Sequence, residues 1–529
     1  MTTPAAMAKG SATRPDAVDA KTWLMVGGSI IGAFMAVLNI QITNASLPNI
    51  QGAIGAGLDD GGWISTAYLV AEIVVIPLTG FLTQVFSLRR YLLANTVLFL
   101  VLSVACASAQ DLTQMIVLRA LQGFFGGTLI PLAFTITLTT LPPSRQPMGL
   151  ALFALSATFA PAIGPTIGGY LTETYGWQWI FYVNLVPGAL MLATLWPTLP
   201  AGKMQPGLLR LGDWPGIATL SIGLATLQTV LEEGNKDDWF GSTFIVRLSL
   251  VAAVSLALFV WIELTSPRPL LDLRLLKRRN FGLGSISSVL LGMALYGSVF
   301  LLPLYLSQMQ GYNAEQVGFV LAWTGLPQLV LIPLVPLLMR WIDARMLVAL
   351  GFALFAASCF LNVATSPDYS GPQLLVPNLV RAVGQALLLT PLTSLTTAGI
   401  ERASAASASA IYNMLRNLGG AIGIAALQTL LTRREQFHSS VLTAHVSPMA
   451  LATQARIAAL QSHFMAAGTS DPAAAWHDAV VQIGRTIRAQ AYFLAYGDAF
   501  YMMGAGLLLA LGAVLLMRKT AGSGATGAH

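Results

Sequence analysis

Long apolar stretches alternate with short polar connections along almost the whole chain. A helix that crosses the hydrocarbon core of a bilayer needs about 20 mostly apolar residues. The pattern therefore predicts an all-α, polytopic membrane protein with fourteen membrane-spanning helices. Their approximate bounds are 22–44, 62–84, 91–109, 114–138, 147–171, 178–199, 214–232, 243–264, 281–308, 315–338, 345–365, 373–398, 405–432 and 496–517.

Composition agrees with a membrane protein and suggests its orientation. The chain is 55% hydrophobic and 9% charged, whereas soluble domains carry about 25% charged residues. The net charge of +6 does not indicate a nucleic-acid partner, because the cytoplasmic loops of membrane proteins are enriched in Lys and Arg. Most basic residues, including Arg89 and Arg90, fall in cytoplasmic loops and tails if both termini are cytoplasmic. We predict that orientation, with no cleaved signal peptide.

An internal repeat divides the predicted helices. At a shift of 256 residues, Pro77-Leu78 falls on Pro333-Leu334, and at a shift of 262 Arg119 corresponds to Arg381. Repeated bundles are typical of secondary transporters, whose substrate site lies at the repeat interface. We expect two pseudo-symmetric six-helix bundles and an inserted helix pair. The predicted units are an N-terminal tail 1–21, a first bundle 22–199, an inserted pair with its linkers 200–280, a second bundle 281–517 and a C-terminal tail 518–529.

A long polar segment, 433–495, interrupts the second bundle on the predicted outer side. Leu442–Ala467 and Ala473–Ala495 read as helices within it. Four of the five histidines fall here. A metal site needs tight ligand spacing and a supporting carboxylate, and the loose spacing of these histidines argues against one. We interpret these four histidines as part of a solvated helix surface and predict no bound metal.

Glu72 is an ionisable residue near the middle of the second predicted span. Placing a charge at the centre of a membrane helix costs roughly 2.5–3.5 kcal/mol on insertion scales, so such residues are candidates for function. A carboxyl group that alternates between buried and hydrated settings can load and release a proton. Glu72 is therefore our candidate proton carrier, with a neutral, hydrogen-bonded structural glutamate as the alternative.

Three arginines also lie inside predicted spans. A guanidinium stays charged, so it must face a partner, a carbonyl group or water. Arg119 can hold a polar network in its bundle or respond to protonation nearby, and the sequence does not separate these roles. Arg381 and Arg416 are interpreted as packing anchors more readily than as ligands.

Uncharged polar residues supply candidates for a substrate cavity. Asn39 and Thr43 share one face of the first span, and such groups suit either substrate binding or interhelical hydrogen bonds, which are worth about 0.6 kcal/mol on average. The full candidate set is Asn39, Gln41, Thr43, Tyr68, Gln122 and Gln328, the last of which corresponds to Glu72 in the repeat.

The fifth span contains an unusual cluster of glycines and prolines. Gly164 and Gly168 are spaced so that another helix can approach closely, Gly169 follows them, and Pro161 and Pro165 each remove a backbone donor and can bend the helix. We predict a bent, tightly packed helix that forms a gating or packing element.

Motifs for other energy sources or for catalysis are not found in the sequence. There is no G-x-x-x-x-G-K-[ST] segment, no H-E-x-x-H and no nucleophile elbow. ATP-driven transport by this chain alone and a membrane-embedded enzyme are both disfavoured. We expect an ion gradient to supply the energy and no cofactor to be bound.

Several segments together are similar to the motifs of one family, and the similarity runs over about residues 22–517. The chain resembles the fourteen-helix, EmrB/QacA-type drug:proton antiporters of the major facilitator superfamily. Gly80, Arg89 and Arg90 match the loop motif between the second and third spans. The matching segments are 34–48, 80–90, 119–123, 164–169, 177–184 and 272–281.

The resemblance implies proton-coupled export of hydrophobic or amphipathic compounds across the bacterial inner membrane by alternating access. It also implies candidate partners for the segment 433–495, because the EmrB-like branch works with a periplasmic adaptor protein and an outer-membrane channel. Two departures matter: Asn39 stands where the family usually has an acidic residue, and Gln84 stands where it often has Asp. The first moves the expected proton carrier to Glu72.

Two other functions stay open at the level of sequence. One is the dedicated export of a single metabolite, such as a siderophore, an antibiotic or an aromatic acid. The other is a membrane receptor or scaffold that transports nothing.

Overall fold

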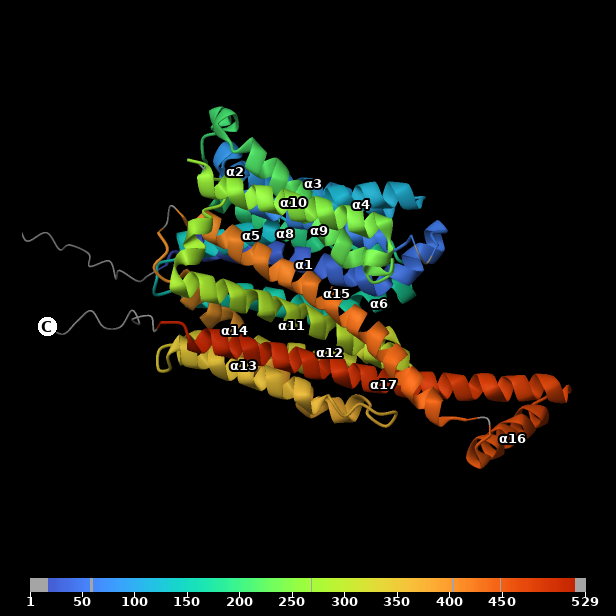
Figure 1. Ribbon diagram of the computed structural model, residues 1–529. Coiled ribbons are helices and arrows are strands. Elements are labelled where there is room, and N and C mark those ends of the chain that lie inside the picture. The colour runs from blue at the N-terminus through green and yellow to red at the C-terminus, as the bar shows by residue number, and fades with distance from the viewer. Residues whose placement is uncertain (1–17, 58–59, 268, 402–403, 448, 519–529) are drawn as a thin grey trace, which may run out of the picture.

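The computed structural model describes residues 18–57, 60–267, 269–401, 404–447 and 449–518. Within these residues, fourteen helical segments are long and apolar enough to cross a membrane, which confirms the predicted all-α, polytopic fold. The predicted tails lie almost entirely outside the described residues. The helices run roughly parallel, and α1 begins at the same end of the bundle where α17 ends (Figure 1). We call this the terminal end and the opposite one the α16 end.

The first six crossings form one bundle in which α1 packs against α5, α6 and α8, and α4 packs against α2 and α3. The fourth crossing is broken at Gly127, which separates α4 from α5, and the sixth is broken between α7 and α8. The elements are α1 (Ala20–Ile54), α2 (Trp63–Phe86), α3 (Leu88–Ala107), α4 (Leu112–Gly126), α5 (Leu129–Thr140), α6 (Gln146–Tyr175), α7 (Trp179–Tyr182) and α8 (Leu185–Thr198).

The last six crossings form a second bundle with its own apolar core. It is held by the pairs α11–α15, α13–α14 and α13–α17. Its elements are α11 (Arg279–Met309), α12 (Ala314–Leu338), α13 (Ala344–Leu361), α14 (Gly371–Thr397), α15 (Ala405–His445) and α17 (Pro472–Leu515), with the short α16 (Leu451–Ala466) between the last two.

The helix α9 (Trp214–Glu233) and the helix α10 (Thr243–Thr265) form the inserted pair, and the turn η2 (Trp239–Gly241) lies between them. The linkers carry η1 (Pro206–Leu211) and η3 (Leu273–Lys277). α9 packs against both α2 and α15, and a separate apolar cluster joins these elements. The pair therefore lies beside the junction of the two bundles, while α10 leaves large apolar side chains such as Leu250 and Trp261 exposed.

Helices α15 and α17 are 41 and 44 residues long, so at 1.5 Å per residue each is about twice as long as the 30 Å hydrocarbon core. Both extend beyond the bundle at the α16 end (Figure 1). The predicted helix at Leu442–Ala467 begins too early, because α15 continues without a break to His445 and α16 starts at Leu451. The predicted helix at Ala473–Ala495 is the first part of α17.

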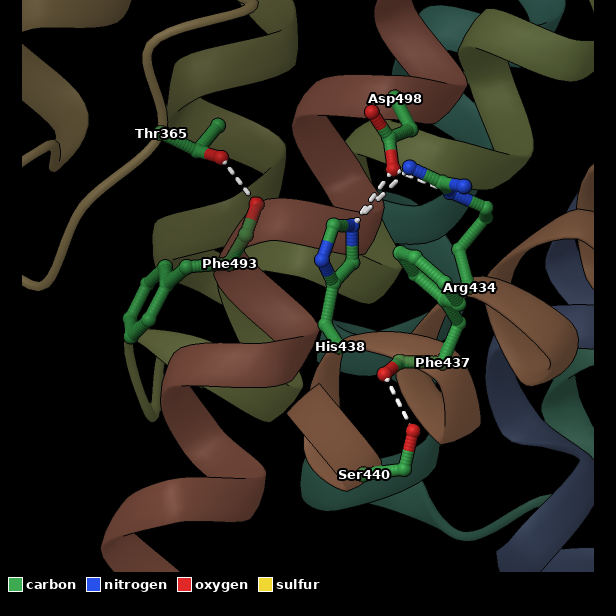
Figure 2. A network of polar contacts seen from close by, with 7 residues as sticks. All are labelled: Thr365, Arg434, Phe437, His438, Ser440, Phe493 and Asp498. Carbon is green, nitrogen blue, oxygen red and sulfur yellow. Dashed lines mark hydrogen bonds and ion pairs between the residues drawn. The ribbon is translucent and has the colours of Figure 1, made fainter. Parts of the chain in front are cut away.

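Polar contacts tie α15 to α17 where the two helices leave the bundle (Figure 2). Arg434 Nε donates to Asp498 Oδ2 at 2.6 Å, and His438 Nε2 lies 2.8 Å from the same oxygen. Thr365 Oγ1, in the loop before α14, donates to the Phe493 carbonyl at 2.6 Å. These contacts hold the base of the extension to the bundle.

Glycines on α15 bring it very close to α11. A Cβ atom added at Gly423 would lie 2.6 Å from Met293 Cα and 2.7 Å from Met293 O. Backbone atoms of a packed helix cannot move aside as a flexible side chain can, so this contact depends on glycine.

We therefore expect Gly423→Ala to lower the melting temperature of the purified protein, with an overpacking cost of about 1–3 kcal/mol. Gly512→Ala, in α17, is the matched control because an added Cβ there meets nothing within 4 Å. A Gly423→Ala protein that melts at the wild-type temperature would contradict the close α11–α15 contact.

Candidate functional site

A cavity of about 410 Å³ lies where the two bundles and the inserted pair meet. Its walls come from α1, α2, α6, α9, α11, α12 and α15. Apolar and aromatic side chains form most of the lining. The polar lining residues are Gln41, Asn44, Glu72, Gln228, Glu232, Tyr296, Ser307, Tyr312 and Asn417.

Glu72 faces this cavity from the middle of α2 and is 4% exposed. Its backbone is held against α4, because a Cβ atom added at Gly127 would lie 2.9 Å from both Cα and Cγ of Glu72. Among the described residues, no side chain or backbone group forms a hydrogen bond or ion pair with its carboxylate. Glu72 is therefore a buried acidic group that faces the cavity and has no hydrogen-bond or ion-pair partner among the described residues.

Arg119 lies behind Glu72 in the first bundle and is 1% exposed. Its Nε donates to the Ile64 carbonyl at 3.3 Å, and its terminal nitrogen Nη1 donates to Gln122 Oε1 at 2.6 Å. The guanidinium carbon is 4.3 Å from the centre of the Tyr68 ring. This aromatic contact and the hydrogen bonds satisfy a permanent charge without a carboxylate in direct contact.

The Arg119 contacts continue as a polar network through the first bundle. Gln122 Nε2 donates to Ser103 Oγ at 2.7 Å. Asn184 Nδ2, between α7 and α8, donates to Asn39 Oδ1 at 2.9 Å, and Thr43 Oγ1 donates to the Asn39 carbonyl at 2.8 Å. The Thr43 bond lies within α1, whereas the Gln122–Ser103 and Asn184–Asn39 bonds join different crossings of the bundle. None of these residues lines the cavity.

Of the six predicted cavity residues, Gln41 lines the cavity. The other five are at most 1% exposed and lie in the bundle interiors. Four belong to the first bundle around Arg119, namely Asn39, Thr43, Tyr68 and Gln122. The fifth, Gln328, donates from Nε2 to Gln385 Oε1 at 2.9 Å inside the second bundle.

The second bundle repeats the arginine arrangement. Arg381 of α14 donates from Nε and a terminal nitrogen to Thr324 Oγ1 at 3.2 and 2.7 Å. Thr324 lies on α12 at the position that corresponds to Tyr68 on α2, because their numbers differ by 256. Each of these two buried arginines thus contacts the same repeat position on a neighbouring helix.

Arg416 of α15 lies where the bundles meet. It donates to Asn413 Oδ1 at 3.0 Å, and its guanidinium carbon is 5.9 Å from the ring centre of Phe153 on α6. It therefore contacts both bundles, although it does not line the cavity.

The glycine-proline segment of α6 lies between α1 and α12. A Cβ atom added at Gly164 would lie 2.5 Å from Gln41 Cβ, and one at Gly168 would lie 3.0 Å from the Ile42 carbonyl oxygen. These two glycines therefore pack on α1, within the first bundle. Pro165 lines the cavity, and Gly169 is buried beside Gly168.

The opposite contacts of the same segment reach the second bundle. Atoms of Ala162 and Thr166 are the nearest neighbours of Gly325 and Gly318 on α12. The segment thus joins the α1 contact within its own bundle to the α12 contact across the bundle interface. A shift of α6 would have to change both contacts together.

The predicted loop motif lies at the terminal end. A Cβ atom added at Gly80 would be 3.6 Å from Ala406 Cβ, next to the start of α15. Arg89 lies with its guanidinium carbon 5.7 Å from the Trp196 ring centre, and Arg90 is exposed. Gly80 is therefore at a contact between the bundles, while the two arginines are not.

Two residues of the inserted pair were missed by sequence reasoning. Gln228 and Glu232 of α9 line the cavity, and Gln228 Nε2 donates to Glu232 Oε1 at 2.9 Å. The available signal was a Gln and a Glu four residues apart on one helix face. Glu232 was easily overlooked because it falls at the predicted end of a span, where acidic residues usually meet water.

Comparisons with known proteins agree with this architecture. The sequence model of the Major Facilitator Superfamily matches residues 29–424 of this chain. Multidrug export protein EmrB of Escherichia coli is 32% identical over 94% of this chain and 96% of that protein. Colistin resistance protein EmrB of Acinetobacter baumannii is 31% identical over 92% of this chain and 94% of that protein.

The fold comparison extends to solved structures. The structure of the proton:xylose symporter XylE covers 93% of this chain and 94% of that chain with a TM-score of 0.57, at 13% identity. Both the expected fold and the expected resemblance are confirmed: this chain belongs to the major facilitator superfamily of transporters.

Proposed function

We propose that this protein exports hydrophobic or amphipathic small molecules of several kinds from the bacterial cell, in exchange for protons. The observation that carries the proposal is the cavity between the two bundles, which combines apolar walls with the unpaired, buried carboxyl group of Glu72. Cavities of about 300–1,000 Å³ with mostly apolar linings hold drug-sized ligands. Two relatives, named a multidrug export protein and a colistin resistance protein, support the same class of activity.

In transport by alternating access, Glu72 acts as the group that binds and releases the proton. Protonation of its carboxyl group favours one facing of the cavity and substrate binding favours the other, because a ligand shifts a conformational equilibrium only through its different affinity for the two states. Arg119 and Tyr68 of the first bundle interact electrostatically with Glu72, and Tyr296 on α11 and Glu232 on α9 line the same cavity. Arg119 is held by its own network and does not line the cavity, so it leaves the Glu72 carboxyl group accessible to a proton or a ligand.

The proton gradient is a sufficient source of energy. One proton that crosses 100 mV supplies about 2.3 kcal/mol, and each pH unit adds about 1.4 kcal/mol. No cofactor is required on this proposal. The protein lies in the inner membrane with both termini in the cytoplasm, and the extension formed by α15, α16 and α17 is then available to a periplasmic adaptor that leads to an outer-membrane channel.

Glu72→Gln is expected to abolish proton-driven accumulation while substrate exchange in the absence of a gradient continues. Without coupling, the accumulation ratio in inside-out vesicles should fall by up to about 500-fold, which is the gradient that one proton can sustain across 100 mV and one pH unit together. Glu173→Gln, at an exposed position of α6, removes an equal charge away from the cavity and should transport normally. Wild-type accumulation by Glu72→Gln would eliminate this residue as the essential carrier.

Gly164→Leu is expected to impair transport or to make the membrane leaky, because a side chain at this position separates α6 from Gln41 on α1. Insertion into the membrane should be normal. The measurement is substrate efflux together with passive dye and proton leakage in the same vesicles. The matched control is Gly27→Leu on α1, where an added Cβ meets nothing within 4 Å, and normal, tightly coupled efflux by an inserted Gly164→Leu protein would contradict the expectation.

A further inference from the structure

The charged residues that line the cavity all carry one sign. Glu72 enters from α2 and Glu232 from α9, and none of the lining residues is a lysine or an arginine. The nearby arginines are already held elsewhere, Arg119 by Gln122 and the Tyr68 ring, and Arg416 by Asn413. A positive charge inside the cavity would therefore meet carboxylates without meeting a competing cation.

Glu233 and Glu263, which are buried acidic residues of the inserted pair, have structural partners. Glu233 accepts a hydrogen bond from Thr66 Oγ1 at 2.9 Å and pairs with Lys236 at 3.2 Å. Glu263 accepts the backbone N–H groups of Leu270 and Leu271 at 3.2 and 3.1 Å. These contacts give both residues a structural role in holding the inserted pair in place.

Glu232 has a different environment, although it is the neighbour of Glu233. Its carboxylate accepts a hydrogen bond from the amide group of Gln228 at 2.9 Å, one helical turn earlier. That contact leaves Gln228 Oε1 buried without a hydrogen-bond partner, and Gln228 is 3% exposed. A buried acceptor without a partner costs about 1–3 kcal/mol, so a cation or donor in the cavity would satisfy a group that the protein leaves unpaired.

The rest of the cavity suits an amphipathic cation. Tyr296, Phe300 and Tyr312 line it together with aliphatic side chains. Aromatic rings attract cations through their faces, and the attraction increases when the cation is desolvated. The apolar wall can therefore hold the body of the ligand while the carboxylates hold its charge.

We propose that Glu232, oriented by Gln228, is the residue that selects positively charged amphipathic substrates, so that the inserted helix pair forms part of the substrate site. This inference rests on the proposed function, since it assigns the substrate class of the same cavity. It also separates two carboxylates by role: Glu72 exchanges the proton, and Glu232 recognises the charge of the cargo.

Tetraphenylphosphonium and tetraphenylborate test the proposal, because the two ions have nearly the same shape and opposite charge. Binding of each would be measured by calorimetry on the purified full-length protein. The wild type should bind the cation more tightly than the anion. Glu232→Gln should weaken binding of the cation about tenfold or more, as expected for the loss of one desolvated opposite charge, and should leave anion binding unchanged or stronger.

Two further variants make the result specific. Glu232→Asp keeps the charge and should retain most of the cation binding. Glu173→Gln removes an exposed charge and should bind both ions as the wild type does. The proposal is overturned if the wild type does not prefer the cation, if Glu232→Gln binds both ions as the wild type does, or if it loses both equally.

Transport measurements distinguish this inference from the proposed function. Proton-driven transport of tetraphenylphosphonium and of the neutral dye N-phenyl-1-naphthylamine would be followed in vesicles. If Glu232→Gln transports the dye normally and loses the cation, both proposals are supported. If both substrates are transported equally by Glu232→Gln and the wild type, charge selection fails while efflux stands. If wild-type vesicles transport neither, efflux fails, and the binding data still decide the role of Glu232.

Discussion

The free energy of a charge in the hydrocarbon core constrains every other feature of this structure. Arg119 and Arg381 cannot lose their charge, so each is surrounded by acceptors or an aromatic face. The networks that achieve this join several helices within each bundle and make each bundle a unit. Glu72 is the exception, because its carboxylate has no partner among the described residues and faces the cavity. The contrast between satisfied arginines and an unsatisfied glutamate supports the proposal that ligands and protons bind in the cavity.

Close helix packing is the second requirement for these networks, because hydrogen bonds between helices form only where the helix backbones lie close together. Gly127 allows α4 to contact the backbone of Glu72, and Gly164 allows α6 to contact Gln41. At α6 the same segment also contacts α12 through Ala162 and Thr166. The glycine-proline segment therefore contacts α1 within its own bundle and α12 in the other bundle, and it also carries Pro165 of the cavity wall.

The inserted pair illustrates how an added element can acquire a role in the site. α9 lies against α2 and α15, beside the bundle junction, while α10 covers α9 and exposes apolar side chains. Glu233 and Glu263 fasten the pair to its surroundings. Glu232 and Gln228 contribute polar groups to a cavity whose other walls belong to the two bundles, and the bundles alone would leave that wall open.

The sequence by itself determined the fourteen spans, because hydrophobic length is a local property of the chain, and it showed the repeat of the two arginines, because the chain can be compared with itself at a fixed shift. It also identified Glu72, since a charge within an apolar stretch is visible without a structure. Only the tertiary structure decided which polar residues reach the cavity: Gln41 does, while Asn39, Thr43, Tyr68, Gln122 and Gln328 bond inside the bundles. It likewise decided that Glu232 faces the cavity and Glu233 faces Thr66. Helix rotation and the identity of the neighbouring helix fix these outcomes, and both are set by packing between segments far apart in the chain.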